Sequence, residues 1–208
     1  MLTAGSRREL LMNDSKHFDT RKLVLMAILT TIVILLQILG TFIRFGPFSI
    51  SLVLMPIVIG AALLGSVMGA WLGLVFGFVV LISGETNLFL AINPVATVFV
   101  VLLKGSLAGF LAGMAYKLLA AHGKIIAAIA AAVVCPVVNT GIFILGGYIF
   151  FLPTFTEWSI AAGATSVTAF LFLGLAGVNF LFELGVNIIL SPTIVRLIQY
   201  KYDNKERV

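Results

Sequence analysis

The sequence predicts an all-α integral membrane protein with six transmembrane helices and with both termini in the cytoplasm. Of its 208 residues, 61% are hydrophobic and only 10% are charged, and the mean hydropathy is +1.19. A soluble domain carries about 25% charged residues, so a separate soluble domain is excluded. The net charge of +5 follows membrane topology, and we expect no nucleic-acid partner.

Apolar runs divide the chain into six expected helices that form one membrane domain over residues 21–200. Polar tails over 1–20 and 201–208 flank this domain, and the first tail lacks the early apolar core of a cleavable signal. A run of about 20 apolar residues is long enough to cross the hydrocarbon core. The expected helices cover about 23–39, 52–64, 65–83, 94–119, 125–151 and 168–199.

The basic residues indicate the orientation of these helices. With the N-terminus inside, the outer loops hold only Arg44, and Lys104 lies within the membrane. The other eleven of the thirteen basic residues are then cytoplasmic, as the positive-inside rule requires: Arg7, Arg8, Lys16, Arg21, Lys22, Lys117, Lys124, Arg196, Lys201, Lys205 and Arg207.

Small residues recur at every fourth position in the third and fourth expected helices. Such residues lie on one face of a helix, where bare backbone lets a second helix approach closely. The stripes are Gly65, Gly69, Gly73 and Gly77 in the third helix, and Gly105, Gly109 and Gly113 in the fourth. The N-terminal half, which is otherwise apolar, is therefore interpreted as a packing or docking half.

Polar residues concentrate in the last three expected helices. Asn179, Glu183 and Asn187 are spaced four apart in the sixth, and Lys104 and Asn139 lie at a similar, central depth in the fourth and fifth. Ionisable residues in a span usually face the bundle interior or a wet cavity and mark functional sites. We therefore expect a polar site there, although hydrogen bonding between helices could explain the same amides.

The roles of these residues stay open on the sequence alone. Lys104 could form an ion pair with Glu183, or it could meet an anionic or strongly polar group of a substrate. Asn139 could contact a substrate or cap the helix break expected at Pro136. Asn187 lies deeper, toward the cytoplasm, and is assigned to helix packing.

Catalytic signatures are absent from the sequence. There is no HExxH, GxSxG or phosphate-binding loop, and His17 and His122 lie outside the expected spans. A single cysteine, Cys135, excludes an internal disulfide and a multi-cysteine metal site. We expect no enzyme, no metal and no cofactor in this chain, and active transport would take its energy from a partner or an ion gradient.

Over residues 20–198 the chain resembles the substrate-binding S components of bacterial energy-coupling factor (ECF) vitamin transporters. The resemblance lies in the size, the six spans and a basic tail that enters the first helix. It also lies in the whole arrangement of TRKLVLMAILTTIVILLQ, SLVLMPIVIGAALLGSVMGAWLGLVFGFVV, NPVATVFVVLLKGSLAGFLAGMAYKLL and FLFELGVNIILSPTIVRLI.

This resemblance implies a vitamin-binding protein of the bacterial cell membrane. Its outward-facing cavity would lie among helices four to six, and the first, third and fifth loops would close over it. The implied partners are a transmembrane coupling subunit and two cytoplasmic ATPase subunits, which use ATP. Together with the polar residues above, it implies the substrate-binding residues Lys104, Asn139, Asn179, Glu183, Asn93 and Arg44.

Docking on the coupling subunit uses an Ala-x-x-x-Ala signature on the first helix of this family. The matching positions here are Ala27 and Thr31, so the second small residue is a threonine. Small residues four apart let a partner helix approach closely, and a threonine preserves that property.

The runs VVCPVVNTGIFILGG and VNFLFELGVNIILSPTIVR most resemble pantothenate-specific S components. A buried lysine suits the carboxylate of pantothenate, and asparagines suit its amide and hydroxyl groups. Folate, cobalamin, pyridoxine or a pyrimidine precursor are alternative substrates. A stand-alone secondary carrier, in which Glu183 and Lys104 relay a proton, is the alternative mechanism.

Overall fold

The computed structural model describes residues 4–42, 44–45, 48–49, 52–175 and 177–206, and within these ranges it leaves some side chains undescribed. Those side chains belong to residues 4–19, 44–45, 48–49, 175, 178–179, 194–195 and 197–206. The helices are α1 (Ala4–Gly40), α2 (Leu54–Leu64), α3 (Ser66–Ile82), α4 (Asn87–Ile92), α5 (Pro94–Leu119), η1 (Ala120–His122), α6 (Lys124–Phe150), α7 (Leu152–Ala161), α8 (Val167–Ala169), the π-helix η2 (Phe170–Leu175) and α9 (Gly177–Glu206).

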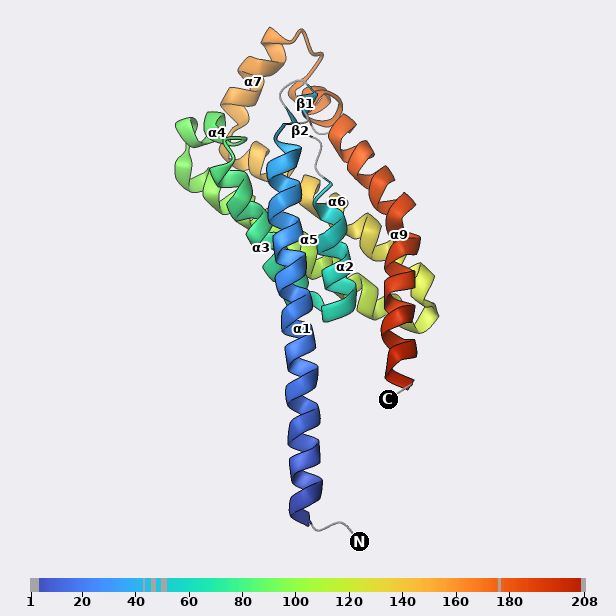
Figure 1. Ribbon diagram of the computed structural model, residues 1–208. Helices are drawn as coiled ribbons and strands as arrows, with labels where there is room; N and C mark the ends of the chain where they lie inside the picture. The colour runs from blue at the N-terminus through green and yellow to red at the C-terminus, as the bar shows by residue number, and fades with distance from the viewer. Residues whose placement is uncertain (1–3, 43, 46–47, 50–51, 176, 207–208) are drawn as a thin grey trace.

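Helices α1, α2, α3, α5, α6 and α9 form a bundle (Figure 1). At one end, called here the loop end, lie α4, α7 and a short antiparallel ladder of β1 (Arg44–Phe45) and β2 (Phe48–Ser49). The start of α1 and the end of α9 both lie at the opposite end, called here the terminal end. The all-helical prediction is confirmed, apart from this two-residue ladder.

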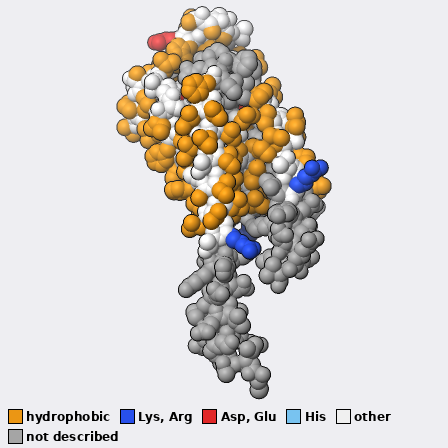
Figure 2. All heavy atoms as spheres, viewed as in Figure 1, with side chains coloured by type: hydrophobic (Ala, Val, Ile, Leu, Met, Phe, Trp, Pro, Cys, Tyr) orange, Lys and Arg blue, Asp and Glu red, His pale blue; other side chains and the backbone are white. Residues whose placement is uncertain are grey.

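Within the described part of the chain, three helical stretches are long and apolar enough to cross a membrane: Thr20–Gly40, Pro94–His122 and Lys124–Phe150. Leu54–Leu64, Ser66–Ile82 and Phe180–Thr193 are apolar but shorter. The 11 residues of α2 rise about 16 Å, roughly half of the hydrocarbon core. Six complete spans therefore stay a prediction. Hydrophobic side chains cover most of the bundle face that Figure 2 shows, with basic side chains toward the terminal end.

The expected segments and the observed helices differ in three places. The first helix continues back to Ala4, so residues 4–20 of the expected polar tail are helical, and the run from Arg7 to Met12 in this stretch consists of good helix formers. The expected loops contain α4 and α7, and Pro153 occupies the first turn of α7, where proline is favoured. The expected last helix is divided into α8, η2 and α9.

Two glycine turns connect neighbouring helices. Gly65 joins α2 to α3 with φ +100°, and Gly123 precedes α6 with φ +130°. These are backbone conformations that glycine adopts without steric cost. The turn at Gly65 is short enough that α2 and α3 pack against each other directly.

Close contact between α3 and α5 is the main packing feature of the fold. Gly69 faces Gly109, and Gly73 faces Gly105, with each glycine against the backbone carbonyl of its counterpart. A Cβ at any of these positions would collide with that carbonyl. The expected packing role is therefore confirmed for these four glycines, whereas Gly65 of the expected stripe precedes α3 and has no atom within 4 Å of a Cβ position. A core of Val33, Leu54, Ile57, Leu72 and Cys135 is buried around this contact.

Candidate functional site

Lys104 of α5 lies in the interior of the bundle, near two aromatic rings and two carboxylates. Its Nζ atom lies 5.4 Å from the ring centroid of Phe76 and 5.9 Å from that of Phe143. Both distances fall within the range of a cation–π interaction. Phe76 belongs to α3, and its ring packs beside Gly105, the neighbour of Lys104. The glycine contact between α3 and α5 therefore supplies one aromatic wall of the site, and α6 supplies the other.

Two carboxylates attract the Lys104 ammonium group. Glu183 of α9 has the larger effect and Glu85, between α3 and α4, the smaller. Glu183 is only 2% exposed. The structure thus brings Lys104 and Glu183 into one electrostatic site, which satisfies the rule that charges inside a bundle face other charges.

A hydrogen bond ties Glu85 to the first helix. Gln37 of α1 is buried, and its Nε2 donates to Glu85 Oε1 at 3.0 Å. The amide keeps the carboxylate on the inner side of α1, where its charge acts on Lys104. This bond links the helix expected to dock on a partner with the polar interior.

Asn139 of α6 is 6% exposed, and its Oδ1 atom has no hydrogen-bond partner among the described residues. Phe143 follows it by four positions, so the two lie on the same face of α6, one turn apart. A buried carbonyl oxygen without a donor is costly. A ligand hydroxyl or N–H group at this position would satisfy it.

The remaining predicted site residues lie in different surroundings. Asn93 caps α5, where its Oδ1 accepts a hydrogen bond from Ala96 N at 3.1 Å. Arg44 is part of β1 and Asn179 is part of α9, but their side chains lie outside the described residues. Asn187 is buried, and its Nδ2 donates to the Glu183 carbonyl at 2.9 Å, a bond within α9.

Sequence reasoning missed three residues of the site: Phe76, Glu85 and Phe143. Two of them belong to α3 and to the connection that follows it, so the surroundings of Lys104 include residues from the half expected to serve packing or docking. The division into a docking half and a ligand half stays a prediction. The close contact of the facing glycines of α3 and α5 places Phe76 beside Gly105, the neighbour of Lys104. Phe143 had a usable signal, because it follows Asn139 by four residues in the same expected helix.

Aromatic side chains from α4, α6 and α7 gather at the loop end. The ring of Phe89 lies 5.2–6.1 Å, centroid to centroid, from four others in edge-on geometry. We call this group the Phe89 cluster, and it consists of Phe89, Phe143, Phe151, Phe155 and Trp158. Such contacts stabilise a packed group beyond its buried area. Phe143 belongs both to this cluster and to the site.

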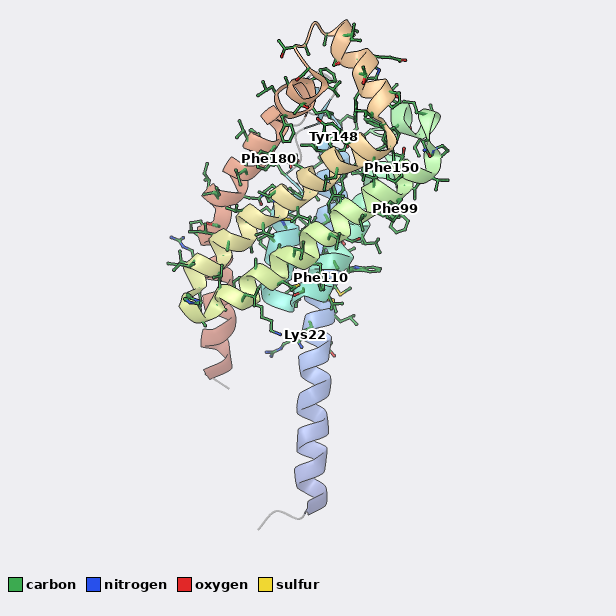
Figure 3. All side chains as sticks on the ribbon, turned by 180° about the vertical axis from the view of Figure 1, so that it is seen from behind. Lys22, Phe99, Phe110, Tyr148, Phe150 and Phe180 are labelled. Atoms are coloured by element: carbon green, nitrogen blue, oxygen red, sulfur yellow. The ribbon has the colours of Figure 1, made fainter. Side chains whose placement is uncertain are left out.

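A groove of about 690 Å³ runs along the outer face of α5, separate from the site. It is almost entirely apolar and contains none of the predicted site residues. Figure 3 shows Phe99, one of its lining residues, on α5, which crosses in front of the bundle beside α6. This groove has the character of a lipid-facing surface. Its lining consists of Pro94, Val95, Val98, Phe99, Leu102, Leu103 and Ser106.

Ala27 and Thr31 are both exposed on the described part of α1. The Thr31 hydroxyl donates to the Ala27 carbonyl at 3.0 Å, so its polar atom is satisfied within its own helix. Nearby, Trp71 Nε1 of α3 donates to Thr30 Oγ1 at 3.4 Å. The Thr31 side chain therefore presents mainly its small apolar part to the outside.

Comparison with known proteins gives one family. A model described as the substrate-specific component of ECF transporters matches residues 21–195. Searches of curated proteins and of solved structures give no significant match. The family consists of membrane transport subunits that take a small-molecule substrate and act with an ECF module, and they are not enzymes. Because the match covers most of the chain and includes every helix around Lys104, the chain belongs to the substrate-specific components of ECF transporters.

Proposed function

We propose that this chain is the high-affinity vitamin-binding subunit of an ECF-type importer and that its substrate is pantothenate. The observation that carries the proposal is Lys104, an ammonium group between the rings of Phe76 and Phe143, with the buried Asn139 one helical turn from Phe143. A cation in an aromatic-walled interior favours an anionic ligand with an apolar body.

The chemical groups of pantothenate match these side chains. Its carboxylate would accept charge-assisted hydrogen bonds from Lys104 Nζ. A hydroxyl or amide N–H would donate to Asn139 Oδ1, and the two methyl groups would pack against the rings. Glu183, which attracts Lys104, would accept a hydrogen bond from the second hydroxyl. Glu85 would keep its hydrogen bond from Gln37 Nε2.

The energy for uptake would come from partner subunits. Residues 21–195 match a transport component, and the sequence lacks a phosphate-binding loop. We propose that Ala27 and Thr31 form a small-residue surface for a transmembrane coupling subunit, which two cytoplasmic ATPases serve. Small side chains would let a helix of that subunit approach α1 closely.

Calorimetry on the purified protein tests the substrate. Pantothenol is the matched control ligand because a hydroxymethyl group replaces the carboxylate of pantothenate. Hydrogen bonds to charged groups contribute about 1.5–3 kcal/mol, so we expect pantothenol to bind about 10- to 100-fold more weakly. Equal affinity would remove Lys104 as the carboxylate partner. Binding of folate, cobalamin, pyridoxine or a pyrimidine precursor in place of pantothenate would identify a different vitamin.

Reconstitution in liposomes tests the mechanism. We expect uptake only when the coupling subunit and the ATPases are present with ATP. The attraction between Glu183 and Lys104 also suits a proton relay, which would make the chain a stand-alone carrier. Uptake by this chain alone, driven by a pH gradient, would overturn the ATP-dependent mechanism and establish that alternative.

A further inference from the structure

One face of α6 connects the site with the loop end. Asn139, Phe143, Gly147 and Phe151 follow each other at intervals of four residues, so they lie along one side of the helix. Asn139 is at the polar interior, and Phe151 is 4% exposed within the Phe89 cluster. Phe143 lies between them and touches both regions.

The ring of Phe143 has two aromatic or cationic partners from different helices. Its centroid is 5.9 Å from Lys104 Nζ of α5 and 6.1 Å from the Phe89 centroid of α4. The planes of Phe143 and Phe89 are at 89°, which is the edge-to-face geometry that aromatic pairs prefer. A change in the position of the ammonium therefore acts on a ring that is also part of the Phe89 cluster.

The Phe89 cluster joins α4 and α7 into one unit. Phe89 of α4 lies 5.9 Å from Phe155 and 5.8 Å from Trp158, both of α7. Phe155 is fully buried, and its ring occupies the space above Gly147 that any side chain there would fill. A movement of Phe89 is thus shared by α7 through direct ring contacts.

We infer that Phe143 is a positioning residue that couples the Lys104 ammonium to the Phe89 cluster. Without ligand, the attraction between the ammonium and the ring face holds Phe143 in place. A bound carboxylate draws the ammonium away from that face, and the ring then repacks against Phe89. This inference rests on the proposed function, because an acidic ligand is what moves the ammonium. Occupancy of the site would thereby change the packing of α4 and α7.

The chain carries its own reporter for this coupling. It has two tryptophans, Trp71 on α3 and Trp158 within the Phe89 cluster. Trp71→Phe leaves Trp158 as the single tryptophan, and acrylamide quenching of its fluorescence, excited selectively over that of the tyrosines, then measures its accessibility. All variants below carry Trp71→Phe in the full-length protein.

A double-mutant cycle without ligand tests the inference independently of the substrate. We expect Lys104→Met to raise the quenching constant of Trp158, although Lys104 is not part of the Phe89 cluster. Lys104→Arg, which keeps the charge, should have a smaller effect. In the presence of Phe143→Leu, the effect of Lys104→Met should be lost. If Lys104→Met changed the quenching constant of Trp158 equally with and without Phe143→Leu, the inference would be overturned.

Two further variants separate a positioning role from a purely structural one. Phe143→Tyr keeps the aromatic face, so the effect of Lys104→Met should return. Phe150→Leu is the matched control on the same helix, because its side chain is 40% exposed (Figure 3) and outside the Phe89 cluster. Phe150→Leu should leave the effect of Lys104→Met on the quenching constant of Trp158 unchanged. A loss of the effect with Phe150→Leu would assign it to general loosening of α6.

Saturating pantothenate provides the second arm, which remains informative if Lys104→Met fails to fold. Pantothenate should change Trp158 quenching in the parent. Phe143→Leu removes one wall of the site and should weaken binding in calorimetry, but at a pantothenate concentration that saturates this variant Trp158 quenching should stay unchanged. An equal change in both proteins would contradict the coupling. A parent that gives no heat with pantothenate refutes the proposed substrate, and the ligand-free cycle then decides the inference alone.

Discussion

Gly73 of α3 and Gly105 of α5 face each other so closely that a Cβ on either residue would collide with the backbone carbonyl of the other. Lys104 directly precedes Gly105, and Phe76 packs beside it. The contact therefore sets both the distance between two helices and the position of one wall of the site.

Substitution of Gly105 by alanine should destabilise the protein. Because the obstacle is backbone, the two helices must separate, and overpacking of this kind costs about 1–3 kcal/mol or more. Thermal unfolding in detergent would measure the loss. Gly141→Ala is the matched control, since a Cβ at this position in α6 meets no atom within 4 Å, and it should leave the unfolding temperature nearly unchanged. Equal effects of the two substitutions would contradict the role of the facing glycines.

Replacement of Asn139 by leucine should weaken pantothenate binding without loss of stability. The Asn139 oxygen has no hydrogen-bond partner among the described residues. Leucine has the same branched shape without polar atoms, so it removes an oxygen that nothing in this part of the structure satisfies. We expect binding weaker by about tenfold or more in calorimetry and an equal or higher unfolding temperature. A marked drop in unfolding temperature with unchanged binding would show that Asn139 is structural.

Neutralising Glu85 should strengthen the binding of an acidic ligand. Glu85 attracts Lys104 and so competes with the ligand carboxylate. Glu85→Gln removes the charge but keeps an oxygen that accepts from Gln37. We expect pantothenate affinity to rise about two- to tenfold, with little change for pantothenol. Glu157→Gln, at an exposed position of α7, is the control. An equal gain for both ligands would mean that charge at residue 85 does not act on Lys104.

Ala27→Leu should leave vitamin binding intact but block uptake by the complete transporter. Ala27 is exposed on α1, so leucine fits the isolated subunit, whereas a closely packed partner helix would meet its side chain. Calorimetry and ATP-driven uptake in liposomes would measure the two properties. Thr31→Ala, which completes the small-residue signature, should preserve both. Loss of binding with Ala27→Leu would show that α1 shapes the site rather than a docking surface.

The sequence predicted those features that depend on local pattern. Apolar runs placed α2, α3, α5 and α6 within about two residues of their observed bounds, and Asn93 followed by Pro94 marks the start of α5. Glycines at every fourth position predicted the packing of α3 on α5. The sequence also singled out Lys104, Asn139 and Glu183, because polar groups in a span are rare, and their contact with a ligand stays a prediction.

Features that depend on the rotation of one helix against another could not be read from the sequence. Phe76 is one of 17 phenylalanines, and its place beside Gly105 and Lys104 depends on how α3 packs against α5. The apolar residues of α4 and α7 have no membrane-spanning length, so they were expected to lie in loops. Their helices are stabilised by aromatic contacts between α4, α6 and α7, which join residues far apart in the chain.

The backbone contact between α3 and α5 has a consequence for the evolution of specificity. A frame built from glycines does not depend on the shapes of neighbouring side chains. Residues such as Lys104, Asn139 and Phe143 can therefore change without altering the spacing of the two helices. One scaffold could in this way acquire new ligand preferences through a few substitutions, while its architecture and its surface toward partner subunits stay constant.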